Sequence, residues 1–316
     1  MKARISPLSV TVSSCYKLCY TPTISQVRKL RHDRLSPERD DDSIFLKKKM
    51  KIDEDREIIY GIAPCQLALK ADRRKIYHIY VRDPAGTLKP NKSIEHIIFK
   101  ARKLGIHVLP SDKRYLDKLT EGRPHQGVAM KATPLRPNLI RHDLDKTAMA
   151  NNRKALWLGL NDVQDPMNLG ALIRTAALMG VNRVVVNSRK TARLSAVVSK
   201  ASAGAMEVYP IYAVKNLSKY LDYLVENDWN IIGTVGHKEV NQYQAISCQN
   251  FNHNGKPTIL MLGNEGFGIS ASIKEKCNSF LTIPTSSSCP PDIDSLNVSV
   301  AAGILLYSLR GRLNRC

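Results

Sequence analysis

The sequence predicts an α/β protein in which a small α/β domain precedes a larger domain built on a mostly parallel sheet. From residue 154 onward, short runs of β-branched and aliphatic residues alternate with segments that are apolar at helical spacing. Such alternation is typical of parallel strands covered by helices on both faces. A shorter alternation occupies residues 57–132, and a stretch with two prolines follows it. The 316 residues are enough for two domains of ordinary size.

The expected elements of the small domain follow from residue spacing and from glycine. Apolar residues at helical spacing stop at Gly105, which favours the end of a helix there. In chain order we expect a short apolar helix around Gly61 (residues 58–74), a strand (75–83), a helix (93–105), a strand (106–111) and a β-like closing run (125–133).

The larger domain is expected to alternate strands with helices throughout. The expected strands are residues 155–162, 183–188, 207–212, 230–236, 257–263 and 280–284, and the expected helices are residues 168–179, 194–203, 217–226, 269–276 and 295–309. Ligands of parallel sheets bind beyond the carboxyl ends of the strands. We therefore expect functional residues in the loops that follow the strands.

The segments outside the two domains differ from them in composition. Residues 1–35 are rich in basic residues, serine and threonine, which is the composition of a mitochondrial transit peptide; a disordered basic tail that binds RNA is the alternative. Residues 36–55 contain blocks of like charge, which predict a linker. Residues 134–153 predict a second linker, so the domains are expected at 56–133 and 154–316.

The charge and the cysteines narrow the class of protein. A formal net charge of +20 favours a polyanionic partner such as nucleic acid, although a solvated basic surface or targeting tail is the alternative. The seven cysteines form no C-x-x-C pair, which favours reduced thiols and argues against a structural zinc site. No apolar run reaches the roughly 18 residues that span a bilayer, so we expect no membrane segment.

The first unusual loop follows the expected strand 155–162. Asp165 and Pro166 form a helix-start signal, and the helix after them is apolar on nearly all sides except at Arg174. Such a helix is expected to be buried, so Arg174 needs a partner. Gly170 would leave space beside the guanidinium and Asn168 would add an amide, which together predict a pocket for a polar or anionic group. A purely structural ion pair of the arginine is the alternative.

Two further loops carry polar residues after strands. Residues 263–268 are rich in glycine and contain Glu265, an acid at a strand end in a chain short of acids; a purely structural glycine turn is the alternative. Ser295 is placed to cap an apolar helix, with Asn297 and Ser299 in its first turn. These two residues must find partners if that helix is buried, so satisfied core polar groups are the alternative.

In this order and spacing, residues 168–174, 262–266 and 295–300 resemble the three signature motifs of the SpoU/TrmH (SPOUT) family of RNA 2′-O-ribose methyltransferases. The resemblance covers residues 154–309, and Gly61 and His125 resemble the family's N-terminal substrate-binding domain. It implies a C-terminal parallel-sheet trefoil-knot methyltransferase domain preceded by a small, ribosomal-protein-like RNA-binding domain. It also implies S-adenosyl-L-methionine as methyl donor, no metal, and a homodimer with its active site at the interface.

The resemblance assigns roles to individual residues of this chain. The active-site positions are Asn168, Arg174, Glu265, Ser295 and Asn297, and the methyl-donor positions are Gly263, Ile283 and Leu296. Residues 284–294 form a longer loop than in typical bacterial members, so the donor contacts of that loop are left undefined. For RNA binding the sequence offers cations beside tyrosines, namely Arg73, Arg74, Lys75 and Tyr77, with Tyr80 and Tyr115 nearby. Packing of these tyrosines in the core of the small domain is the alternative.

The expected function is transfer of a methyl group to the 2′-hydroxyl of a guanosine in the peptidyl-transferase region of mitochondrial large-subunit rRNA, in the matrix. The alternatives are methylation of tRNA or another RNA, and a non-catalytic RNA-binding assembly factor with the same fold. An unrelated nucleotide-binding enzyme is disfavoured by the absence of a P-loop lysine. The general base stays open: either Arg174 takes the hydroxyl proton, or it orients the ribose while water or Glu265 takes the proton.

Overall fold

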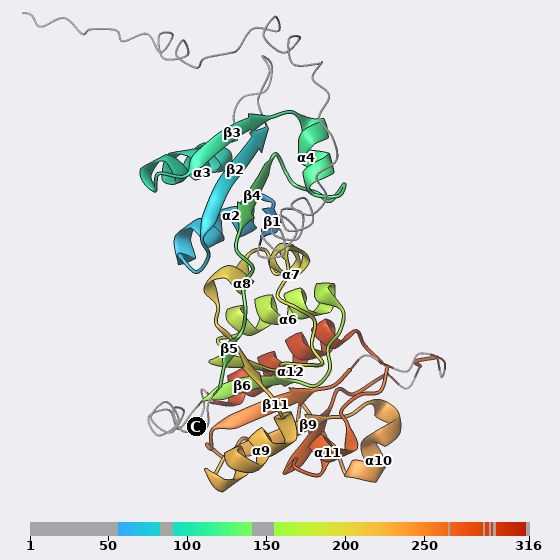
Figure 1. Cartoon of the computed structure of the whole chain (residues 1–316). Coiled ribbons are helices and arrows are strands. Elements are labelled where there is room, and N and C mark those ends of the chain that lie inside the picture. Colours follow the sequence, from blue (N-terminus) through green and yellow to red (C-terminus); the bar gives the residue numbers. More distant parts are fainter. Residues whose placement is uncertain are drawn as a thin grey trace, which may run out of the picture. The chain divides into compact units, whose positions relative to one another are not determined.

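The computed structural model describes residues 56–82, 91–140, 155–264, 266–286, 288–290, 292 and 295–313, with side chains up to residue 311 (Figure 1). The expected transit peptide, the charged linker and Glu265 lie outside the described residues, as does most of the second linker.

The small domain is a four-stranded sheet with its main core under two helices. Strand β2 pairs with β3 in parallel and with β4 antiparallel, and β1 pairs with β4 antiparallel, which gives the order β1-β4-β2-β3. Ile59, Ile79 and Met130 are fully buried in this core. The elements are β1 (Glu57–Tyr60), α2 (Ile62–Ala71), β2 (Ile76–Arg82), α3 (Lys92–Lys103), β3 (His107–Ser111), α4 (Lys113–Leu119) and β4 (Val128–Ala132).

Two predictions for the small domain need correction. The helix expected around Gly61 begins after that residue, and the residues before it form β1. Gly61 has φ 96°, a backbone conformation that glycine adopts without strain, and so it can turn the chain from strand to helix. Helix α4 is not among the expected elements, although Asp112 caps it by accepting a hydrogen bond from the backbone N of Tyr115. The end of α3 before Gly105 is confirmed.

The larger domain contains an eight-stranded sheet in which every pairing is parallel, in the order β10-β12-β9-β11-β6-β7-β8-β5. The strands are β5 (Asn138–Leu139), β6 (Leu156–Leu160), β7 (Arg183–Asn187), β8 (Ile211–Val214), β9 (Asn230–Thr234), β10 (Ile246–Ser247), β11 (Thr258–Leu262) and β12 (Ser279–Thr282). The helices are α6 (Pro166–Leu178), α7 (Ala196–Ala201), α8 (Ala205–Val208), α9 (Leu217–Glu226), the 3₁₀ turn His237–Glu239, α10 (Val240–Tyr243), α11 (Ala271–Lys274) and α12 (Val298–Leu313).

Helices cover both faces of this sheet, as the alternation predicts. Along β6, Leu156, Leu158 and Leu160 belong to the core under α6 and α12, whereas Trp157 belongs to the core under α9 and α11. Figure 1 shows these two helix pairs on opposite sides of the strands. Both faces of the central strands are therefore buried, which explains why they are continuous apolar runs.

All six predicted strands of the larger domain are present, with one wrong boundary. Glu207 and Val208, expected to open a strand, belong to α8, and the strand begins at Ile211. Strands β5 and β10 are not predicted, because two residues are too few to show a period. Helix α12 begins at Val298 rather than at Ser295.

The small domain is joined to the larger one by a buried ion pair. The guanidinium of Arg74 donates from Nε to Glu207 Oε2 (2.7 Å) and from Nη2 to Glu207 Oε1 (2.9 Å). Its Nη1 donates to Glu57 Oε2 (2.7 Å) and to the carbonyl of Thr133 (2.8 Å). The side chains of Arg74 and Glu207 are 1% and 0% exposed, so the pair is fully withdrawn from water.

Candidate active site

The start of α6 is built as the sequence predicts. The side chain of Asp165 accepts hydrogen bonds from the backbone N of Met167 and of Asn168, and Pro166 occupies the first helical position. The cap fixes the first turn of α6, and with it the backbone of Asn168, at the carboxyl end of β6.

Arg174 does not lie where the sequence predicts. The apolar pattern of the helix predicts burial, but the side chain is exposed and makes no ion pair with any residue that the structure describes. Met167 and Leu178, which are 57% and 75% exposed, stand on the same face of α6 because they are seven residues before it and four after it. Arg174 is therefore a cation on an exposed, otherwise apolar helix face.

Gly170 has a different role from the one predicted. A Cβ atom at this position would lie 2.5 Å from Cβ of Ala201 and 2.8 Å from the carbonyl O of Val198. The space beside Gly170 is thus filled by α7, and the glycine allows α6 and α7 to pack closely. It opens no pocket beside the guanidinium.

Asn168 and Asn297 are brought together from positions 129 residues apart. Nδ2 of Asn297 donates to Oδ1 of Asn168 (3.0 Å). Oδ1 of Asn297 accepts from the backbone N of Ser299 (2.9 Å) and from its Oγ (2.6 Å), so Asn297 rather than Ser295 caps α12. The hydrogen bond between the two asparagines ties the amino-terminal turns of α6 and α12 into one polar site.

The glycine-rich turn after β11 closes on itself. Asn264 and Gly268 exchange backbone hydrogen bonds of 2.9 Å, and Oδ1 of Asn264 accepts from the backbone N of Gly266 (2.8 Å). A Cβ at Gly263 would lie 2.0 Å from the carbonyl carbon of Gly268, so only glycine fits there. Nδ2 of Asn264 donates to the carbonyl of Asp162 (3.0 Å), which fixes the turn against the loop after β6.

The other predicted site residues differ in their exposure. Ser295 and Leu296 are exposed, Leu296 by 49%, whereas Ile283 is half-buried against the main core. Gly263 lies at the end of β11, within the closed turn. Glu265, the acid of that turn, lies outside the described residues.

The RNA contacts predicted for Arg73 and Arg74 do not fit their surroundings. Arg74 is fully engaged in the buried ion pair, and Arg73 Nη1 donates to the carbonyls of Met206, Glu207 and Tyr209. Burial lowers the pKa of Arg73, whereas for Arg74 the hydrogen bonds and charge of Glu207 and Glu57 outweigh burial and raise the pKa. Both guanidiniums hold the two domains together, so neither is open to a phosphate.

Lys75 and Tyr77 remain at the surface of the small domain. Lys75 is exposed, and its Nζ lies 5.4 Å from the centre of the Tyr77 ring, over which the guanidinium of Arg56 also stacks at 4.6 Å. Tyr80, by contrast, is 8% exposed and packs in the core of the small domain, in agreement with the alternative interpretation.

In the parts of the chain that the structure describes, no three His, Cys, Asp or Glu side chains are grouped to hold a metal ion. No helix among the same residues is both long enough and apolar enough to cross a membrane.

Comparisons with known proteins connect this site to a family. A profile of the SpoU rRNA Methylase family matches residues 155–307, and a profile described as RNA 2'-O ribose methyltransferase substrate binding matches residues 58–138. The chain is 37% identical over 258 residues to rRNA methyltransferase 1, mitochondrial, of Homo sapiens, which covers 80% of this chain and 72% of that protein. It is 33% identical over 255 residues to the 23S rRNA (guanosine-2'-O-)-methyltransferase RlmB of Pasteurella multocida, covering 80% and 97%.

The fold is shared with solved structures. The AdoMet-bound rRNA methyltransferase from Sinorhizobium meliloti gives a TM-score of 0.64 at 21% identity and covers 84% of this chain and 90% of that one. This likeness confirms the predicted fold class, a parallel-sheet SpoU/TrmH methyltransferase domain preceded by a small α/β domain. With the three motifs in place, two matching profiles and relatives above 30% identity over most of their length, the chain belongs to the SpoU rRNA methylase family.

Proposed function

We propose that this protein transfers the methyl group of S-adenosyl-L-methionine to the 2′-hydroxyl of a guanosine ribose in mitochondrial large-subunit rRNA. The observation that carries this proposal is the 37% identity to the human mitochondrial rRNA methyltransferase, over a span that includes all three motifs. The guanosine follows from the activity for which the relative in Pasteurella multocida is named. The matrix as site of action and residues 1–35 as the targeting segment are part of the proposal.

The methyl donor fits at the turn after β11. Gly263 has no room for a side chain because the turn folds back on it, so a ligand there meets backbone rather than a Cβ. Leu296 is 49% exposed just ahead of α12, and Ile283 closes the end of β12. These three residues would hold the donor, which supplies an activated methyl on a sulfonium that is a good leaving group.

The residues of this chain then have to align and deprotonate the ribose. The 2′-oxygen forms a bond to the methyl carbon while the carbon–sulfur bond breaks, and the hydroxyl proton is released. Asn168 and Asn297 are held by their mutual hydrogen bond, which positions both amides before substrate arrives. Arg174 would act on the ribose either as base or by orienting the hydroxyl while water or Glu265 takes the proton.

We further propose that two copies of the chain pair through α6 and α12. These helices pack on each other and leave Met167, Leu178, Val300, Ile304 and Tyr307 between 39% and 75% exposed. Val300, Ile304 and Tyr307 share one face of α12, since they are four and three residues apart. A second copy on this surface would cover Arg174 and complete the site at the interface.

Pairing through this surface can be tested by substitution. We expect Tyr307→Asp, which places a charge on the apolar face, to shift the protein from dimer to monomer in sedimentation velocity and to abolish methyl transfer. The exposed Val225→Asp on α9 serves as the matched control, because Val225 is 45% exposed on another helix. A dimeric Tyr307→Asp protein would place the interface elsewhere.

The function itself is tested by mapping ribose methylation on mitochondrial rRNA from cells with and without the protein. We expect one 2′-O-methylguanosine to disappear from the large-subunit rRNA and to return with the wild-type protein but not with Arg174→Ala. Loss of a methyl group from tRNA alone would assign a different RNA, and an unchanged methylation pattern would favour a non-catalytic assembly role.

A further inference from the structure

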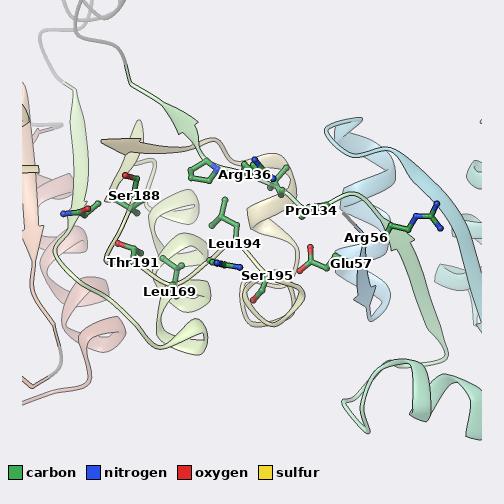
Figure 2. A pocket seen from close by; sticks show the side chains of 15 residues that line it. Arg56, Glu57, Pro134, Arg136, Leu169, Ser188, Thr191, Leu194 and Ser195 are labelled. Atoms are coloured by element: carbon green, nitrogen blue, oxygen red, sulfur yellow. The ribbon is translucent and has the colours of Figure 1, made fainter. Parts of the chain in front are cut away.

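Two hollows adjoin each other at the carboxyl edge of β6, β7 and β8. The first has a volume of about 530 Å³ and the second about 300 Å³, and both are lined by Asn187, the last residue of β7. Figure 2 shows the first hollow, with Arg136 of the chain before β5 beside the loop that carries Ser188, Thr191, Leu194 and Ser195.

Exposed cations line both hollows. Arg136 and Arg193 line the first, and Arg189, Lys190 and Lys215 line the second. All five are exposed, and among the residues described in the structure only Lys190 has an ion-pair partner, Asp162 at 3.3 Å. Glu57 is the one acid in either lining, and its carboxylate is already bound to Arg74 and to the backbone N of Ala196.

Arg56 does not add to this set of cations. It lines the first hollow, but its guanidinium lies over the ring of Tyr77, and Figure 2 shows it beyond Glu57 and turned away from the other lining residues.

The loop that carries three of the cations is held in place. Oδ1 of Asn187 accepts from the backbone N of Arg189 (3.1 Å), and the backbone N of Ala192 donates to the carbonyl of Val163 (3.0 Å). Oγ1 of Thr191, which lines the first hollow, is buried and has no hydrogen-bond partner among the described residues. The loop thus presents its charges from a fixed backbone and keeps one polar atom unused.

The hollows flank the candidate active site on both sides. The first reaches Leu169, the residue after Asn168. The second reaches Asn161 and Ser270, which lie on either side of the turn at residues 263–268: Asn161 donates its backbone N to the carbonyl of Leu262 (2.8 Å). A chain lying in both hollows would pass directly beside the proposed site of methyl transfer.

We propose that the two hollows form one cationic track, defined by Arg136, Asn187, Arg189, Lys190, Arg193 and Lys215, which holds the sugar–phosphate backbone of a single-stranded RNA segment next to the methylated nucleotide. This inference rests on the proposed function, because it names how that RNA is held. Repeated cations along an open edge suit a chain of phosphates, whereas a single small anion needs a closed site with fewer charges.

The test is RNA binding by the full chain, which does not depend on turnover. The double variant Arg189→Gln/Arg193→Gln removes one cation from each hollow, and Lys215→Gln is a second, independent variant. Using an unstructured oligoribonucleotide, we expect the double variant to bind at least about tenfold more weakly and to lower the slope of log affinity against log salt by about 1.4, which corresponds to two lost phosphate contacts on a single strand. The KM for rRNA should rise, with kcat and the Kd for S-adenosyl-L-methionine unchanged.

The matched control is Lys256→Gln/Lys276→Gln, which removes the same charge at the opposite edge of the sheet. Lys256 and Lys276 precede β11 and β12 and are paired with Asp228 and Asp222. Equal affinity and equal salt slope in the two double variants would overturn the track. A wild-type protein that binds RNA through these cations but methylates no ribose would overturn the proposed function and leave the track standing.

Discussion

At the scale of single residues, the exposure of Arg174 changes how its role is understood. A buried arginine would need a structural partner, and its removal would cost stability. An exposed one that has no described ion-pair partner is available to a substrate, and its conformation is set by the helix face on which it stands. Activity and stability should therefore respond differently to its substitution.

We expect Arg174→Ala to lower kcat by a factor of about 10² to 10³, the usual effect of removing one group that stabilises a transition state. The free energy of unfolding should change by less than about 0.5 kcal/mol, because the side chain is exposed. Single-turnover methylation, calorimetric binding of the donor and urea unfolding measure the three quantities. Wild-type turnover by the alanine variant would return Arg174 to a structural role, and partial activity of Arg174→Lys would favour orientation by charge over proton abstraction.

At the scale of elements, the site depends on close packing between α6 and α7. Gly170 brings α6 against Ala201 and the backbone of Val198, and the same helix carries Asn168 toward Asn297. A change in the distance between α6 and α7 is therefore transmitted to the hydrogen bond between the two asparagines.

We expect Gly170→Ala to destabilise the protein by about 1–3 kcal/mol, because the new Cβ would overlap a carbonyl that cannot rotate away. The shift of α6 should also lower methyl transfer under conditions where the protein is fully folded. Urea unfolding and activity assays measure the two effects.

Gly303→Ala in α12 is the matched control. Its Cβ would meet no atom closer than Thr175 Cγ2 at 4.0 Å, so it should stabilise the helix by up to about 1 kcal/mol. A neutral Gly170→Ala variant would show that α7 can move aside without cost.

At the scale of the whole molecule, the two domains are joined through charges rather than through a polar surface open to water. Arg74 and Glu207 are both withdrawn from solvent, and Ser199 also donates to Glu207 (2.7 Å). Removing one partner leaves the other buried and uncompensated, which is more costly than never having built the pair.

We expect Arg74→Met to destabilise the protein by about 3–5 kcal/mol. The double variant Arg74→Met/Glu207→Gln should regain part of this loss, because it leaves no uncompensated charge. Urea unfolding of the single and double variants measures the coupling.

The control at the surface is Lys256→Met, which breaks an ion pair whose side chains are 47% and 77% exposed and should cost less than about 1 kcal/mol. If Arg74→Met were as mild as Lys256→Met, the buried pair would not hold the domains together.

The sequence by itself determines most of the elements and the site motifs. The cap at Asp165, the stop before Gly105 and the central strands depend on neighbours within a few residues, so local spacing is enough to predict them. The three motifs likewise identify Asn168, Asn297 and the glycine turn from residue types and their order alone. Preferences that act over a few residues are encoded in short stretches of sequence, and these features need nothing more.

Only the tertiary structure decides what these residues touch. Arg74 and Glu207 are 133 positions apart, Asn168 and Asn297 are 129 apart, and neither pair leaves a periodic trace in the sequence. The exposure of Arg174 and the filled space beside Gly170 depend on which helix packs on which. The same cation can therefore be interpreted from the sequence as an RNA contact and yet be a buried bridge between domains, because burial is set by segments that lie far away along the chain.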